Sequence, residues 1–96
     1  MKRKNDYSLK EVLEAFVKAY GMEDKLNEAE LINSWDKVVG PIFSKHTQHL
    51  NIKNKILYVK LDSAALRNEM MMARGMLVKM LNRETGKKII EDIVLR

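Results

Sequence analysis

Residues 47–61 read TQHLNIKNKILYVKL, and in this stretch the apolar side chains recur at every second position. Alternation with a period of two is typical of a strand that is buried on one side. The Lys53-Asn54-Lys55 segment in the middle has the composition of a tight turn. The stretch therefore predicts a β-hairpin with strands at 47–53 and 56–61. The apolar positions are Leu50, Ile52, Leu57, Val59 and Leu61.

The N-terminal part of the chain has apolar residues at the spacing of an amphipathic helix instead. Ser8 and Glu11 have the spacing of a capping box, which predicts where this first helix begins. Gly21 supplies a left-handed residue that ends it. The apolar stripe consists of Leu9, Val12, Leu13, Phe16, Val17 and Tyr20.

A second helix is expected between these two regions. Asn27 and Glu30 form a cap-like pair at its start, and Gly40 ends it. Pro41 suits the first position of a further helical turn, where its missing N–H costs nothing. Trp35 lies on the apolar face of this helix, so we expect Trp35 to anchor the core and Gly40 to have a structural role. The apolar face consists of Leu31, Ile32, Trp35, Val38 and Val39.

One long third helix and a last strand are expected after the hairpin. Asp62 or Ser63 caps the helix, and Gly86 follows its end. Gly75 lies inside it and marks either a break or a close approach of another backbone. Residues 88–95 are rich in Ile and Val, which indicates a strand. The expected core stripe of the helix is Leu66, Met70, Ala73, Leu77, Met80 and Leu81.

The resulting fold class is α+β, with the order α-α-β-β-α-β. Helices and strands must share one core, so we expect the helices to cover one face of a three-stranded sheet. The other face is open, as antiparallel pairing permits. We expect a flexible basic arm at residues 1–7 and a single domain at residues 8–96.

The composition and the absence of known motifs exclude several classes of function. The chain has no cysteine, which excludes disulfides, thiolate catalysis and cysteine-based zinc sites. No apolar run approaches the roughly 20 residues of a membrane span, and a cytoplasmic, nucleoid-associated protein is expected. No phosphate-binding glycine loop, HExxH or GxSxG motif is present, so no catalytic activity, cofactor or small-molecule substrate is expected. His46 and His49 are expected to be surface or turn residues rather than metal ligands.

The charge is uneven along the chain and favours an anionic partner. Residues 41–96 carry eleven basic and five acidic side chains, out of a formal net charge of +5 for the whole chain. The open sheet face would display Tyr58 among basic residues, which suits base stacking and phosphate contacts. The expected nucleic-acid contacts are Lys2, Arg3, Lys4, Lys53, Tyr58, Lys60, Lys87 and Lys88.

A second candidate surface lies on the third helix. Arg67, Met71, Arg74 and Val78 fall on one line of a helical wheel, away from the core stripe. Arginine with flexible apolar side chains is typical of a protein interface. The alternative is a boundary face that packs against a sheet edge or another helix within the same chain.

Several motifs together resemble the DciA family. They are WDKVVGPI at 35–42, HT at 46–47, ILYV at 56–59, DSAALRNEM at 62–70, LN at 81–82 and Gly86, and the resemblance covers residues 8–95. It implies a fold similar to type II KH domains and to the N-terminal domain of DnaA. It also implies a non-enzymatic adaptor that binds the bacterial replicative DNA helicase, binds DNA and assists helicase loading.

Two departures from those families limit what is carried over. The GxxG loop with which KH domains grip nucleic acid is missing, so their groove is not expected here. Many DciA members also carry a basic extension after the domain, which this sequence lacks, so we expect only modest, nonspecific DNA affinity. Two other functions remain open: an RNA- or single-strand-DNA-binding module without a helicase partner, and a structural domain that homo-oligomerises through the methionine-rich helix.

Overall fold

The computed structural model describes residues 7–96, and the predicted hairpin is the centre of the fold. It consists of β1 (Thr47–Lys53) and β2 (Ile56–Leu61), which pair antiparallel. Asn54 and Lys55 connect them, and both have positive φ angles of 53° and 64°. Two such residues are what a tight turn with the twist of a hairpin requires. The predicted hairpin is therefore confirmed with its boundaries.

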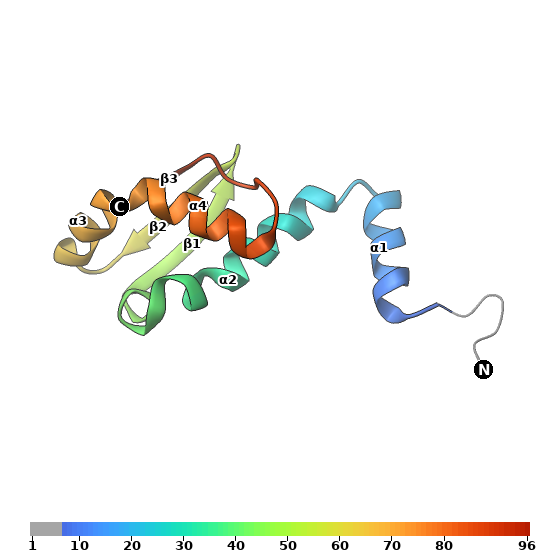
Figure 1. The fold of residues 1–96 in the computed structure, drawn as a ribbon, viewed down its shortest axis with the longest axis horizontal. Helices are drawn as coiled ribbons and strands as arrows, with labels where there is room; N and C mark the ends of the chain where they lie inside the picture. The colour runs from blue at the N-terminus through green and yellow to red at the C-terminus, as the bar shows by residue number, and fades with distance from the viewer. Residues whose placement is uncertain (1–6) are drawn as a thin grey trace.

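The third strand makes the sheet mixed. β3 (Asp92–Leu95) pairs parallel with β2, and the strand order is β1-β2-β3 (Figure 1). The expected strand at 88–95 is thus shorter than predicted and is not antiparallel to its neighbour. A parallel neighbour needs a crossover, and the helical segment between β2 and β3 provides it.

The second helix is longer than predicted. α2 (Glu23–Lys45) begins at Glu23 rather than near Asn27, and acidic residues in its first turn suit the positive end of the helix dipole. Gly40 interrupts it with φ 84° and ψ 171°, and Pro41 then opens the final turn. The break at Gly40 and the turn after it agree with the prediction.

The third helix is broken in two, so the expectation of one long helix is wrong. α3 (Ala64–Met72) is capped by Ser63, whose hydroxyl accepts a hydrogen bond from Leu66 N at 3.3 Å. α4 (Arg74–Thr85) follows at once, and Ala73, with φ −98° and ψ 9°, serves both helices as a cap. Gly86 then ends α4 in the left-handed conformation. The α+β class and the order of helices and strands are confirmed.

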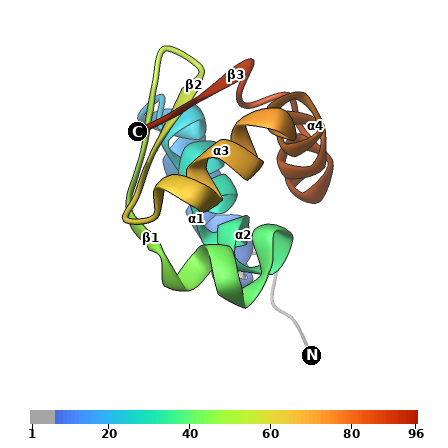
Figure 2. The same ribbon diagram turned by 90° about the vertical axis from the view of Figure 1, so that its left-hand side faces the viewer.

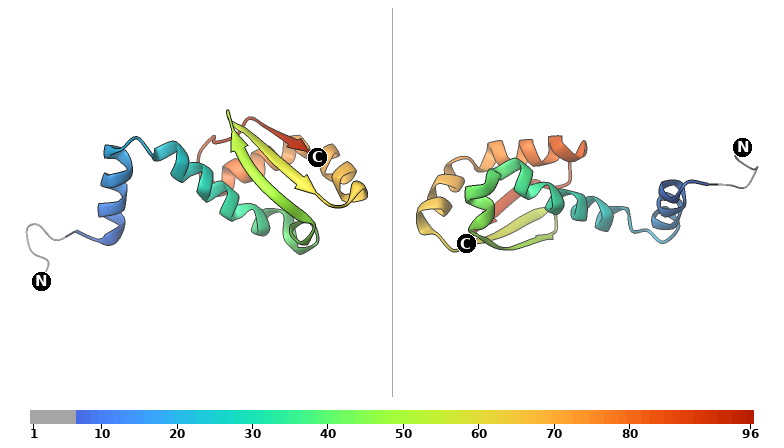
Figure 3. Two further views of the ribbon diagram at one scale, coloured as in Figure 1. Left: turned by 180° about the vertical axis from the view of Figure 1, so that it is seen from behind. Right: turned by 90° about the horizontal axis from the view of Figure 1, so that it is seen from below.

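The core lies between the sheet and the helix pair α2 and α4 (Figure 2; Figure 3, left). The opposite face of the sheet is not covered by a helix of the described chain. Met80, expected in the core, is 39% exposed, because the buried side of α4 passes through Leu77, Leu81 and the half-buried Val78. The buried apolar residues are Leu31, Trp35, Ile52, Leu57, Val59, Leu61, Met70, Leu77, Leu81, Ile89, Ile90, Ile93 and Leu95.

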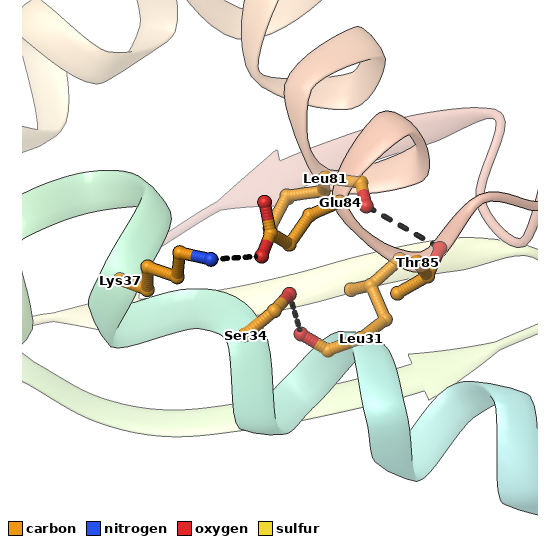
Figure 4. A network of polar contacts seen from close by, with 6 residues as sticks. All are labelled: Leu31, Ser34, Lys37, Leu81, Glu84 and Thr85. Atoms are coloured by element: carbon orange, nitrogen blue, oxygen red, sulfur yellow. Dashed lines mark hydrogen bonds and ion pairs between the residues drawn. The ribbon is translucent and has the colours of Figure 1, made fainter.

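Polar contacts join the two core helices (Figure 4) and hold the segment that follows α4. Lys37 of α2 forms an ion pair with Glu84 of α4. Asn82 of α4 donates from Nδ2 to Ile90 O at 2.8 Å, and its Oδ1 accepts from the backbone N–H groups of Ile89 and Ile90. Asn82 therefore holds the segment that leads into β3 against the end of α4.

The first helix differs most from expectation. α1 (Leu9–Ala19) has the predicted cap, since Ser8 Oγ accepts from Glu11 N at 3.1 Å, and Gly21 follows it with φ 65°. Yet α1 lies beyond the end of the sheet rather than over it (Figure 1). The radius of gyration is 16.5 Å, against about 12 Å for a compact chain of this length. Helices cover one face of the sheet as expected, but α1 is not part of that layer.

Candidate functional site

The open face of the sheet carries the first candidate surface. Period-two alternation sends Asn51 of β1 and Tyr58 of β2 outward as direct neighbours, and His49 lies opposite Lys60. A register shift between Thr47 and His49 accommodates one extra residue in β1 before these pairs begin. The sheet therefore brings together Tyr58 and Lys60, two of the predicted nucleic-acid contacts.

Arg96 completes this surface and was missed by the sequence analysis. Its guanidinium carbon lies 5.1 Å from the centroid of the Tyr58 ring, a cation–π arrangement. Its backbone continues the pairing of β3 with β2, because Arg96 N donates to Val59 O at 2.9 Å and Leu61 N donates to Arg96 O at 2.8 Å. The parallel register that pairs Tyr58 with Val94 would have revealed the contact, but the sequence alone did not supply that register.

These residues line a shallow hollow of about 440 Å³, which we call the sheet hollow. Its lining contains two cationic side chains and no acidic one, so it suits an anionic ligand. The ring of Tyr58 is half-buried, so a base could stack on it only where Arg96 moves aside or sandwiches the base. The sheet hollow is lined by His49, Asn51, Tyr58, Lys60 and Arg96.

The other predicted basic contacts lie elsewhere. Lys87 and Lys88 lie after α4 and line a different hollow of about 360 Å³, together with the hairpin turn and the start of α2. Lys87 Nζ donates to Asn27 Oδ1 at 3.0 Å, and Asp24 and Glu28 also line this hollow. Its charge is therefore mixed. Lys53 is exposed at the end of β1, and Lys2, Arg3 and Lys4 lie outside the described residues.

The predicted partner line is divided by the break at Ala73. Arg67 and Met71 belong to α3, whereas Arg74 and Val78 belong to α4, so one helical wheel does not describe them. Val78 is half-buried against the core. Arg74 pairs with Asp92 of β3 at 3.4 Å and contacts Met71 Sδ at 3.6 Å. Arg74 therefore contacts the edge of the sheet while its side chain stays about half exposed, and Met71 is 42% exposed.

Further exposed methionines lie on the same two helices. Met72 at the end of α3 is 84% exposed and Met76 of α4 is 66% exposed. Met80 lies one turn after Met76, on the same side of α4. Flexible thioether side chains of this kind adapt to the shape of a partner.

The third apolar surface is on α1. None of the residues of α1, all of which are described, is buried. Five large side chains lie on its exposed side, which we call the α1 stripe. They are Leu9 (74% exposed), Val12 (50%), Leu13 (52%), Phe16 (53%) and Tyr20 (69%), the last of these in the cap position.

Trp35 and His46 contact other residues of the fold. Trp35 is 1% exposed and donates from Nε1 to Thr47 Oγ1 at 3.0 Å, and Thr47 in turn donates to Phe43 O at 2.7 Å. His46 Nδ1 lies 2.7 Å from Asp62 Oδ1 on the surface. Among residues 7–96, no three His, Cys, Asp or Glu side chains gather where they could hold a metal ion. Nor does any described helix combine the length and apolar character needed to cross a membrane.

These features define a class of protein: a small α+β domain with an open mixed sheet and helices that expose apolar side chains. The sequence profile of one family, described as "Dna[CI] antecedent, DciA", matches residues 8–95. The chain therefore belongs to the DciA family, a replication-associated family linked to helicase loading. A search of curated proteins found none that matches.

Proposed function

We propose that this chain is a non-enzymatic adaptor that binds the bacterial replicative DNA helicase and assists its loading on DNA. The observation that carries the proposal is the family match over residues 8–95, which includes every helix and strand of the described chain. The helicase hydrolyses ATP, and this chain supplies contacts. We therefore expect no ATP hydrolysis by the isolated chain.

Different surfaces of the chain suit a protein partner and a nucleic-acid partner. Exposed apolar side chains flanked by arginine suit a protein partner, because aromatic residues, methionine and arginine are enriched at interfaces. Met71 and Arg74 on α3 and α4 have this character. The sheet hollow, which has cationic and aromatic side chains, suits nucleic acid.

The helicase contact is tested with the purified chain and the replicative helicase of its own organism. We expect a complex in analytical ultracentrifugation and a rise in the amount of helicase retained on single-stranded DNA when the chain is added. A chain that is folded, as shown by circular dichroism, but neither binds the helicase at tens of micromolar nor changes its retention would contradict the proposal.

The nucleic-acid contact is proposed to be weak and independent of sequence. If about four phosphates are neutralised, the logarithm of the association constant for a single strand falls with the logarithm of the salt concentration at a slope of about −3. Fluorescence anisotropy with a labelled 30-nucleotide strand measures this slope. We expect Lys60→Gln to make it less steep by about 0.7 and Tyr58→Ala, but not Tyr58→Phe, to weaken binding by about 1–3 kcal/mol. Sharp sequence preference or insensitivity to salt would argue against it.

A second candidate function is a single-strand-DNA- or RNA-binding module without a helicase partner. The observation that favours it is the hollow itself, which has two cationic and no acidic lining residues. The two candidates differ in one result: the module binds oligonucleotides through Tyr58 but gives no complex with the helicase.

A further inference from the structure

α1 is short, and the apolar side chains of the α1 stripe are exposed to water, so few contacts stabilise it as a single helix. α1 has eleven residues, and isolated helices shorter than about 12–15 residues are only marginally stable in water. Capping by Ser8 and the stop at Gly21 favour the helix but do not cover its apolar side. Within the described chain α1 touches mainly α2, on the side that carries Glu14, Val17 and Lys18. The stripe points to another side of the helix.

The spacing of the stripe is symmetric when read in either direction. Leu9, Leu13, Phe16 and Tyr20 follow one another at intervals of four, three and four residues. This is the seam spacing of a pair of helices packed side by side. Reversal of the chain direction leaves the intervals unchanged and exchanges the two leucines with the two aromatic residues.

We propose that the α1 stripe binds the α1 stripe of a second copy of this chain, with the two helices antiparallel. In this arrangement Leu13 faces Phe16 of the other copy, and Leu9 faces its Tyr20, so every layer of the seam contains one leucine and one aromatic ring. A parallel pair would instead place ring against ring and leucine against leucine. Antiparallel helices also bring opposite ends of their dipoles together.

The residues beside the stripe permit this approach. Ala15 and Ala19 lie on one side, next to Val12, and small side chains let helices come close. Lys10 lies on the other side and already pairs with Glu14 of its own helix at 4.0 Å. In the antiparallel pair the two Lys10 residues are nine positions out of register, about 13 Å apart along the axis. No like charges therefore face each other across the seam.

The area is sufficient for a weak dimer and small for a permanent one. Five large side chains that are half exposed or more present on the order of 500 Å² per copy, or roughly 1,000 Å² for the pair. Specific interfaces begin at about this size. We therefore expect a dissociation constant on the order of 10 µM, so that monomer and dimer exchange with concentration.

Sedimentation equilibrium of the full 96-residue chain from about 1 to 500 µM tests the proposal. The wild-type chain is expected to change from monomer to dimer over this range, and Phe16→Glu to raise the dissociation constant at least about 30-fold. Met76→Glu is the matched control, because it places the same charge on a methionine that is 66% exposed elsewhere, and should leave the dimer intact. The fluorescence of Trp35, the sole tryptophan, verifies that the core is folded in both variants.

A mixing experiment tests the orientation. At about 30 µM, Leu13→Lys alone and Phe16→Glu alone should each be largely monomeric. An equal mixture at the same concentration should form a heterodimer, because position 13 of one copy faces position 16 of the other. A wild-type chain that stays monomeric at 500 µM overturns the proposal. This result would also be obtained if the α1 stripe bound only the helicase. Dimerisation that Met76→Glu abolishes and Phe16→Glu leaves unchanged overturns it as well, and a mixture that fails to associate overturns the antiparallel arrangement.

Discussion

Trp35 connects the helical layer to the sheet through both packing and a hydrogen bond. Its ring is buried in the core, and its indole N–H reaches Thr47 at the first residue of β1. We expect Trp35→Ala to lower the free energy of unfolding by about 3–5 kcal/mol, because the cavity adds to the lost transfer energy. That is a large part of the stability of a small domain.

Urea titration followed by circular dichroism measures the loss. Trp35→Phe is the matched variant: it keeps most of the apolar volume and removes the hydrogen bond, so its cost should be smaller than that of alanine. An unchanged unfolding midpoint for Trp35→Ala would show that the side chain does not support the core.

Asn82 stabilises the fold through side-chain hydrogen bonds, which a hydrophobic pattern does not predict. Its side chain satisfies three backbone groups, at Ile89 and Ile90. Asn82→Ala leaves these groups without their partner, and we expect a loss of about 2–4 kcal/mol. The exposed Asn33 of α2 is the control, since Asn33→Ala should change stability by less than about 0.5 kcal/mol. Equal effects of the two substitutions in thermal unfolding would remove Asn82 from this role.

At the scale of elements, the division between α3 and α4 changes what the predicted partner line can do. Arg67→Glu with Arg74→Glu removes the half-exposed pair of Arg74 with Asp92, which should cost no more than about 1 kcal/mol of stability. If the line contacts the helicase, binding should weaken by about 2–5 kcal/mol. Calorimetric titration with the helicase measures it.

The matched control for this pair is Lys79→Glu with Arg83→Glu, which makes the same charge change on exposed residues of α4. An unfolded Arg67/Arg74 double variant would show that the line is structural. A folded variant with wild-type helicase affinity would leave the sheet hollow as the next candidate.

Local signals explain which elements could be predicted from sequence. The hairpin was predicted with its boundaries because period-two alternation and a two-residue turn at Asn54 are both local. A break was anticipated only as one of two interpretations of Gly75, and it lies two residues earlier, at Ala73. Its position could not be predicted locally, because alanine is the strongest helix former.

Surfaces were harder to predict than helices and strands, because a surface depends on contacts between residues that are far apart in the sequence. The amphipathic pattern of α1 shows that one side is apolar, but not what covers it. The contact of Arg96 with Tyr58 depends on the parallel register of β3, which joins residues far apart in sequence. Tyr58 and Lys60 were found because they lie two positions apart on one strand of the hairpin, so period-two alternation places both on its outward face.

At the scale of the whole molecule, α1 should be separable from the folded core. Removal of residues 1–21 deletes no residue of the buried core, so we expect the melting temperature at a few micromolar to change little, corresponding to less than about 1 kcal/mol. Differential scanning calorimetry measures it, with the wild-type chain at the same low concentration as control. A large fall in melting temperature would place α1 within the cooperative unit.

The parallel pairing of β2 with β3 also sets an order of events in folding. The hairpin closes over a two-residue turn, a process that takes microseconds, whereas β3 can pair only after residues 62–91 have formed their helices and crossed the sheet. Chain-closure entropy therefore makes the docking of β3 a late step. The same four-residue edge strand should be the first to detach in native-state fluctuations, and its amide hydrogens should exchange with solvent sooner than those of β2.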